Sequence, residues 1–383
     1  MELLPLLVDD FISGLHFPKT MKWGNFDIRF VRPIQWILIN FDGKPVPYTF
    51  QHIESKGITY GHRLLGSHKP VIVSDFSDYC EKLRAEHVEI DPEIREQIIS
   101  SEVNNLIKKD QEYLHTDEQL LNENIYLTEY PRVFRGAFRE KYLEIPQPVL
   151  ISAIRKHQKA FTLVDANGQI LPAFLVISNM PLDSMDEIRS GYERVLEARL
   201  ADAHFFFRED LKQPLADRHR QLSKVVYHKE LGSLEDKTER IRKLAGILCN
   251  LLSIDPGYIP LIDRAAYLCK SDLVTEIVQE FPDLQGIMGC EYALKNGENP
   301  EVAKIIGDQY LPRFPGDKLP SGKGGAIVSL ADRMDTIIGG FGLDMIPTGT
   351  KDPYGLRRTG RGLIEILCAF QFAVPMNDWV KES

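Results

Sequence analysis

Hydrophobic and polar residues alternate near the start of the chain, in a pattern that predicts paired strands. The alternation runs over residues 34–38 and again over 46–50, and Asp42-Gly43 lies between the two runs. Asp-Gly between alternating segments is typical of a tight hairpin turn. A second hairpin is predicted at Asn167-Gly168, where apolar residues flank the turn, and a further strand over 125–134.

Helical spacing dominates elsewhere. Apolar residues over 76–83 recur at i, i+3, i+4 and i+7, and Asp91-Pro92 supplies a helix cap followed by a first-turn proline. From Asp186 onward the pattern stays helical. It gives stripes over residues 241–252, 265–273, 327–341 and 356–370, the last helix being expected to start at Asp352-Pro353. The Gly- and Pro-rich span 296–325 is predicted to be a long functional or mobile loop.

These patterns predict an α+β protein in two parts. Residues 1–220 form a mixed sheet and helix region, possibly with two subdomains, and residues 221–383 form an all-helical domain. The length of 383 residues suits two or three domains.

Composition indicates an ordinary soluble protein. Apolar residues make up 43%, charged residues 26%, and the formal net charge is −9. No apolar run approaches the ~20 residues of a membrane helix, and the N-terminus does not resemble a secretory signal. The five cysteines contain no CxxC pair, which favours reduced thiols in a cytoplasmic protein over disulfides or a zinc site.

The segment Gly322-Lys323-Gly324-Gly325 invites interpretation as a phosphate-binding loop. That motif requires a Ser or Thr after the lysine to hold magnesium, and Gly324 stands there instead. Its preceding glycine, Gly316, also lies one residue too far back. A turn that caps the following helix is the simpler interpretation.

Three later segments, YHKELGSLEDKTERI, RAAYLCKSDLV and SLADRMDTI, resemble metal-binding segments of HD-superfamily phosphohydrolases in order and spacing. Their metal positions would fall on His228, on the pair Cys269-Lys270 and on Asp332. A lysine ammonium repels the cation that a carboxylate at that position would bind. The sequence therefore predicts an HD-like helical domain with a degenerate site that holds no metal. A half-buried, hydrogen-bonded His228 and an Asp332 that bonds a neighbouring helix are the simpler alternatives.

Cations gather in the C-terminal phrase TGTKDPYGLRRTGRG. Lys351, Arg357 and Arg358 lie around one predicted helix start, where backbone N–H groups also suit phosphate contact. A solvated charged face is the alternative.

Longer segments resemble one known family, the beta subunit of the bacterial-type, heterotetrameric glycyl-tRNA synthetase. They include FPKTMKWGNFDIRFVRPIQWIL, TYGHRL, LEIPQPVLISAIRKHQKAF, GYERVLEARLADAHFFFRED, LPSGKGGAIVSLADRMDTIIGGF and PTGTKDPYGLRR, in family order over nearly the whole chain. Tyr192 and Ala160 depart from the family pattern, which has Asn and an aromatic residue at these positions. Family members extend further at both ends, so the chain is expected to be a fragment that lacks the extreme N-terminus and the anticodon-binding domain.

The resemblance implies a ligase subunit without catalytic residues of its own. In the family, an alpha subunit binds glycine and ATP with Mg²⁺, and the beta subunit binds glycine tRNA and completes an alpha2beta2 assembly. This chain is then expected to bind no cofactor, to be inactive alone, and to contact tRNA through Lys323, Lys351, Arg357 and Arg358. Two alternatives remain open: an HD-type metal phosphohydrolase and a purely structural module that binds protein.

Overall fold

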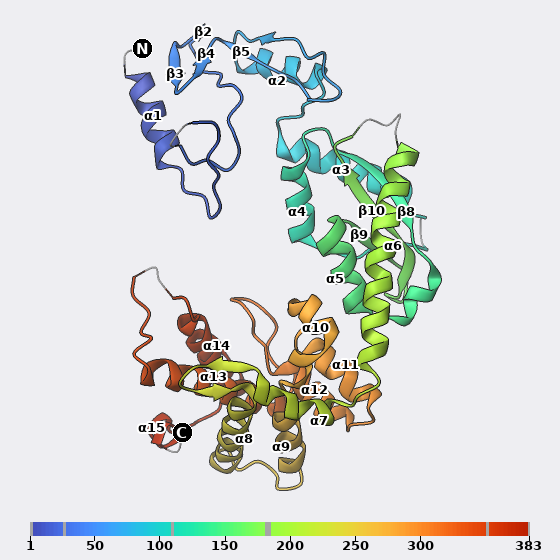
Figure 1. The fold of residues 1–383 in the computed structure, drawn as a ribbon, viewed down its shortest axis with the longest axis vertical. Coiled ribbons are helices and arrows are strands. Elements are labelled where there is room, and N and C mark those ends of the chain that lie inside the picture. Colours follow the sequence, from blue (N-terminus) through green and yellow to red (C-terminus); the bar gives the residue numbers. More distant parts are fainter. Residues whose placement is uncertain (1–2, 26–27, 109–110, 181–184, 350–351, 382–383) are drawn as a thin grey trace. The chain divides into compact units, whose positions relative to one another are not determined.

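The computed structural model describes residues 3–25, 28–108, 111–180, 185–349 and 352–381 (Figure 1). The chain divides into two compact units. The first comprises Met1–Arg139 and Ile154–Leu196, and the second comprises Glu140–Ala153 and Glu197–Ser383. Helices and small sheets occur together, which confirms the α+β class. The boundary expected near residue 220 stays a prediction.

The first unit contains several short strands, and four helices precede α5 in the part of it that the structure describes. The helices are α1 (Leu4–Gly14), α2 (Phe76–Ala85), α3 (Pro92–Leu106) and α4 (Glu118–Leu127). The strands are β1 (Asn40–Phe41), β2 (Lys44–Pro45), β3 (Tyr48–Phe50), β4 (Ile53–Ser55), β5 (Ile58–Thr59), β6 (Val71–Ile72), β7 (Tyr113–Leu114), β8 (Arg132–Ala137), β9 (Phe161–Val164) and β10 (Ile170–Ser178). Helices α5 (Gln147–Gln158) and α6 (Met185–Asp210) contribute residues to both units.

The core of this unit lies on an antiparallel sheet of order β7-β9-β10-β8. Alternate residues of β10 point to one face, where Ala173, Leu175 and Ile177 pack with residues of α3 and α4. Phe174 between them is fully buried and lies against Gly136 of β8, where an added Cβ would come within 2.4 Å of the ring. Gly136 thus leaves room for the aromatic ring beside the neighbouring strand.

Several predictions in this region are confirmed. The turns at Asp42-Gly43 and Asn167-Gly168 join β1 to β2 and β9 to β10. Helix α3 begins at Pro92, and the Asp91 carboxylate accepts the N–H of Glu93 at 2.9 Å.

Two strand predictions were wrong. Residues 34–38 form no ladder with any residue that the structure describes, although Trp36 donates from Nε1 to Thr59 Oγ1 at 3.2 Å. Residues 125–127 belong to α4, which Asp117 caps through the N–H of Leu120, and the strand begins only at Arg132. The local cap favours a helix where the run of apolar residues alone suggested a strand.

The second unit is mainly helical. Its helices are α7 (Leu215–Arg218), α8 (Leu234–Leu251), α9 (Ile259–Leu268), α10 (Glu276–Glu280), α11 (Ile287–Lys295), α12 (Pro300–Asp308), α13 (Lys323–Gly342), α14 (Leu356–Phe370) and α15 (Met376–Lys381), with 3₁₀ turns at Glu140–Glu144, His219–Lys224, Ser271–Val274 and Pro282–Leu284. A short hairpin, β11 (Val226–His228) with β12 (Gly232–Ser233), interrupts the expected all-helical pattern. Gly232 has a φ of +84°, and Ser233 then caps α8.

Helix α13 is the centre of this unit and packs against α8, α9, α12 and α14. Its first turn contains Gly324 and Gly325, both buried. An added Cβ at Gly324 would come within 2.5 Å of Ile305, and one at Gly325 within 2.5 Å of Asp308. The two glycines therefore let α12 and α13 approach closely, so the glycine motif is part of a packed helix and not a separate turn.

The span expected to be a long loop contains α12, which Asn299 caps by accepting the N–H of Glu301 at 2.8 Å. Helix α14 begins at Leu356, three residues after the predicted Pro353, because Gly355 adopts a φ of +67°. Asp352 nevertheless caps the helix start, since it accepts the N–H groups of Leu356 and Arg357, both at 2.9 Å. In the described part of the chain, the helices are too short or too polar to cross a bilayer.

Candidate functional site

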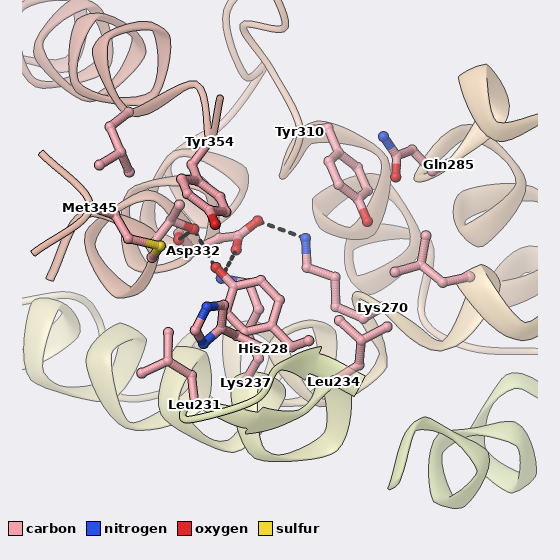
Figure 2. A pocket seen from close by; sticks show the side chains of 14 residues that line it. His228, Leu231, Leu234, Lys237, Lys270, Gln285, Tyr310, Asp332, Met345 and Tyr354 are labelled. Atoms are coloured by element: carbon pink, nitrogen blue, oxygen red, sulfur yellow. Dashed lines mark hydrogen bonds and ion pairs between the residues drawn. The ribbon is translucent and has the colours of Figure 1, made fainter. Parts of the chain in front are cut away.

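A cavity of about 360 Å³ opens beside Asp332 in the second unit (Figure 2). We call it the tyrosine cavity, since Tyr227, Tyr310 and Tyr354 line it. Its remaining lining residues are His228, Leu231, Leu234, Lys237, Lys270, Leu273, Gln285, Asp332, Thr336, Met345 and Leu356. The segments that resembled metal-binding segments therefore meet in space, with His228, Lys270 and Asp332 around one cavity.

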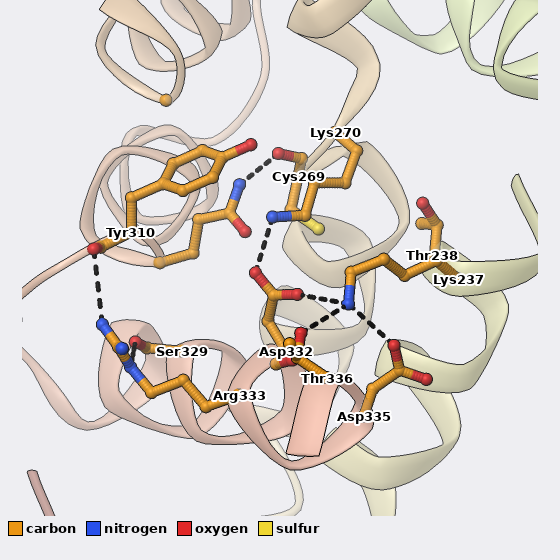
Figure 3. A network of polar contacts seen from close by, with 12 residues as sticks. Lys237, Thr238, Cys269, Lys270, Tyr310, Ser329, Asp332, Arg333, Asp335 and Thr336 are labelled. Carbon is orange, nitrogen blue, oxygen red and sulfur yellow. Dashed lines mark hydrogen bonds and ion pairs between the residues drawn. The ribbon is translucent and has the colours of Figure 1, made fainter. Parts of the chain in front are cut away.

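Two lysine ammonium groups hold the carboxylate of Asp332 (Figure 3). Lys270 Nζ lies 2.6 Å from Oδ2, and Lys237 Nζ lies 2.9 Å from Oδ1. Both lysine side chains are almost fully buried, with exposed fractions of 4% and 5%. Lys270 also lies 4.0 Å from the ring centroid of Tyr310, and Lys237 lies 4.5 Å from that of Tyr227. These cation–π contacts further stabilise the ammonium groups at the cavity wall.

The three charges fix one another's protonation states. Burial alone would raise the pKa of Asp332, but the two lysines outweigh it and hold the pKa well below its usual value. Burial would lower the pKa of Lys270, and Asp332 outweighs it, so the pKa is raised. The same balance raises the pKa of Lys237. The group therefore stays fully ionised near neutral pH, with more positive than negative charge around Asp332.

Asp335 extends this network to α8. It accepts from Lys237 Nζ at 2.7 Å and from Arg240 Nε at 2.5 Å, and Thr336 Oγ1 accepts from Lys237 at 3.0 Å. Asp332 and Asp335 are three residues apart on α13, and Lys237 and Arg240 are three apart on α8. Residues at this spacing share one helix face, so the two faces meet as a pair of acids against a pair of bases.

The arrangement does not suit a divalent cation. Both oxygens of Asp332 already accept from ammonium groups at the positions a metal would take. The Cys269 thiol is fully buried, and burial raises its pKa to about 12, so it is not a thiolate ligand. His228 is half-buried and its Nδ1 accepts the N–H of Glu230 at 3.3 Å. Among the residues that the structure describes, no group of three or more His, Cys, Asp or Glu side chains could hold a metal ion.

A second cavity of about 330 Å³ adjoins the first and shares Gln285, Tyr310, Asp332 and Thr336 with it. We call it the arginine cavity, because Arg313, Arg333 and Arg358 line it together with Gln309, Pro312 and Thr359. Arg333 donates from Nη2 to the carbonyl oxygen of Pro312 at 2.7 Å, and Arg313 donates to the carbonyls of Asp283 and Gln285 at 3.2 and 3.3 Å. These backbone contacts hold both guanidinium groups in place without neutralising them.

Two other predicted tRNA-binding residues, Lys323 and Arg357, are not among the residues that line either cavity. Lys323 is exposed at the first position of α13, and Arg357 is exposed on α14, with Nη1 donating to the carbonyl of Gly349. Lys351 lies outside the described residues. Among the candidates that the structure describes, Arg358 is the one that lines a cavity together with Asp332.

Sequence reasoning missed Lys237, Arg240 and Asp335, and also Arg313 and Arg333. The matched three-residue spacing of Lys237 with Arg240 and of Asp332 with Asp335 was a usable signal for the first group. Arg313 follows Pro312 in an irregular segment, and no periodic pattern marks its position.

The whole chain matches a known family. A family model described as "Glycyl-tRNA synthetase beta subunit" covers residues 1–383. The glycine–tRNA ligase beta subunit of Geobacter sp. (strain M21) is 44% identical over 382 residues, which are 100% of this chain and 55% of that protein. The corresponding subunit of Geobacter sulfurreducens is 45% identical over 366 residues, 96% of this chain and 52% of that protein. That of Desulfitobacterium hafniense (strain Y51) is 41% identical over 383 residues, 100% of this chain and 55% of that protein. The chain spans about half the length of the curated relatives it matches.

Proposed function

The chain belongs to the family of glycyl-tRNA synthetase beta subunits, and from this membership we propose that it supports the ATP-dependent ligation of glycine to tRNA. Its part in the reaction is to bind glycine tRNA and to assemble with the alpha subunit in an alpha2beta2 complex. The observation that carries the proposal is the identity of 41–45% over nearly the whole chain to proteins with this name.

In this proposal the chemistry belongs to the partner. The alpha subunit binds glycine, ATP and Mg²⁺, and the isolated chain catalyses no step. The assembly works in the cytoplasm. The paired lysines on Asp332 support a non-catalytic role, because they occupy the carboxylate that a metal-dependent hydrolase would use. Residues 221–383 are then an HD-like domain whose metal positions, His228, Cys269, Lys270 and Asp332, have lost their original chemistry.

The tRNA backbone is proposed to contact Lys323, Lys351, Arg357 and Arg358. The exposure of Lys323, Arg357 and Arg358 supports this assignment. None of these three forms an ion pair with a described residue, so their charge is available to phosphates.

Co-purification with the alpha subunit, followed by a glycylation assay, tests the proposal. We expect the chain to elute with the alpha subunit and to shift tRNA in a gel with a steep salt dependence. Glycine-dependent ATP–pyrophosphate exchange by the chain alone should equal the blank.

Three results would contradict it. The absence of both co-elution and a tRNA shift would favour a purely structural module that binds other protein. Clear exchange activity by the chain alone would contradict the division of labour. Stoichiometric manganese, iron or zinc in the purified chain would revive the phosphohydrolase alternative.

A further inference from the structure

The tyrosine cavity and the arginine cavity adjoin at Asp332, and the two have complementary chemistry. Tyrosine rings and aliphatic side chains dominate the first, and guanidinium groups dominate the second. Cavities of some hundreds of Å³ that combine apolar walls with a few convergent polar groups are typical ligand sites. We propose that the joined cavities bind a nucleoside monophosphate, with its phosphate among the arginines and its flat base among the tyrosines.

Charge is the first argument. Five described lining residues are cationic, namely Lys237, Lys270, Arg313, Arg333 and Arg358, and Asp332 is the one carboxylate among the described lining residues. Lys237 and Lys270 already neutralise that carboxylate. None of the three arginines forms an ion pair with a described residue. An anion is therefore the missing counter-charge, and the planar fork of Arg suits a phosphate.

Unsatisfied polar atoms are the second argument. The hydroxyl of Tyr310, Nε of Arg313 and Oε1 of Gln309 are buried without a hydrogen-bond partner among the residues that the structure describes. Gln309 is 1% exposed and Tyr310 lies where the two cavities meet. Buried polar groups are normally hydrogen-bonded, so these two donors and one acceptor indicate a polar ligand.

The third argument concerns the other half of the ligand. Tyr354 is 54% exposed, and it lines the tyrosine cavity together with Tyr227, Met345 and Leu356. Tyr354 and Met345 both lie beside Asp332 (Figure 2). Aromatic rings next to apolar side chains accept a flat heterocycle by stacking, as in single-stranded nucleic-acid sites.

The test is calorimetric titration of the 383-residue chain with AMP, adenosine, ribose 5-phosphate and inorganic phosphate. We expect AMP to bind at submillimolar concentration, and adenosine and phosphate to bind more weakly. Arg358→Gln removes an exposed cation from the cavity and should weaken AMP binding about tenfold. Arg357→Gln, its neighbour outside the cavity, is the matched control and should leave AMP binding unchanged. Tyr354→Ala should weaken the binding of AMP but not that of ribose 5-phosphate.

The same chemistry could come from a free nucleotide or from a nucleotide of RNA. Competition between labelled AMP and tRNA separates them: displacement assigns the cavity to RNA, and no displacement assigns it to a free nucleotide. The proposal is overturned if AMP does not bind at about 1 mM, or if Arg358→Gln and Tyr354→Ala both bind it like the unmodified chain. Either failure would leave the proposed ligase function intact, since that is tested by co-purification and glycylation.

Discussion

The ammonium group of Lys270 lies 2.6 Å from Oδ2 of Asp332, in a wall of the cavity that also contains His228. Lys270 directly follows the fully buried Cys269. Its contact with Asp332 joins the turn after α9 to the middle of α13.

This ion pair makes Asp332 important for stability. Asp332→Ala would leave the buried ammonium group of Lys270 without a carboxylate partner and remove one of the two that Lys237 contacts. Loss of one member of a buried pair costs about 3–5 kcal/mol of unfolding free energy, measured by urea denaturation. Glu365→Ala is the control, because Glu365 pairs with the 60% exposed Arg361, and it should cost about 1 kcal/mol or less. Equal effects of the two changes would contradict this prediction.

Asp272 should make stability fall as pH rises. Burial raises the pKa of Asp272 to about 6, against roughly 4 in an unfolded chain. Between these values the folded state binds more protons than the unfolded state, so the stability present below pH 4 decreases up to pH 6. In Asp272→Asn the amide oxygen can still accept from Gly286 and Gly289. As the pH rises from 4 to 8, the unfolding free energy of the variant should therefore increase by about 3 kcal/mol relative to that of the unmodified chain.

Urea unfolding of both proteins at the two pH values checks this, since ionisations common to both cancel in the comparison. A stability difference between variant and unmodified chain that does not change with pH would show that Asp272 titrates normally.

Lys323 should affect stability and RNA binding in opposite directions. It is an exposed cation in the first turn of α13, where the helix dipole disfavours positive charge, and Gly322 offers no side-chain cap. Lys323→Gln should raise the unfolding free energy by about 0.3–1 kcal/mol. It should also weaken tRNA binding and lower the salt slope by about one unit. Unchanged tRNA binding would leave Lys323 as an ordinary surface residue.

Arg357 gives a second test of the tRNA surface. Arg357→Ala should weaken binding to different tRNA sequences about equally, and should lower the salt slope by about one unit, because a phosphate contact carries no sequence information. Arg361→Ala is matched to it on the same helix and removes a cation already paired with Glu365 at 2.7 Å. Filter binding at several salt concentrations measures both, and identical slopes for the two variants would remove Arg357 from the interface.

The sequence alone determined the elements whose signals are local. Helix α3 follows from Asp91-Pro92, and the hairpin of β9 and β10 follows from Asn167-Gly168 with its flanking alternation. The family was also recognisable, because long ordered segments do not depend on knowing the fold. The presence of Lys270 next to Cys269 also predicts a site that holds no metal, and this stays a prediction.

Only the tertiary structure decided which residues surround Asp332. Lys237 is 95 residues before it in the chain, and Arg358 comes from another helix, so no local pattern joins them. The same holds for residues 34–38, whose alternation suits a strand but which find no ladder partner in the described part of the chain. Charge pairing and strand pairing depend on groups distant in sequence, and packing around α13 determines which of these groups meet.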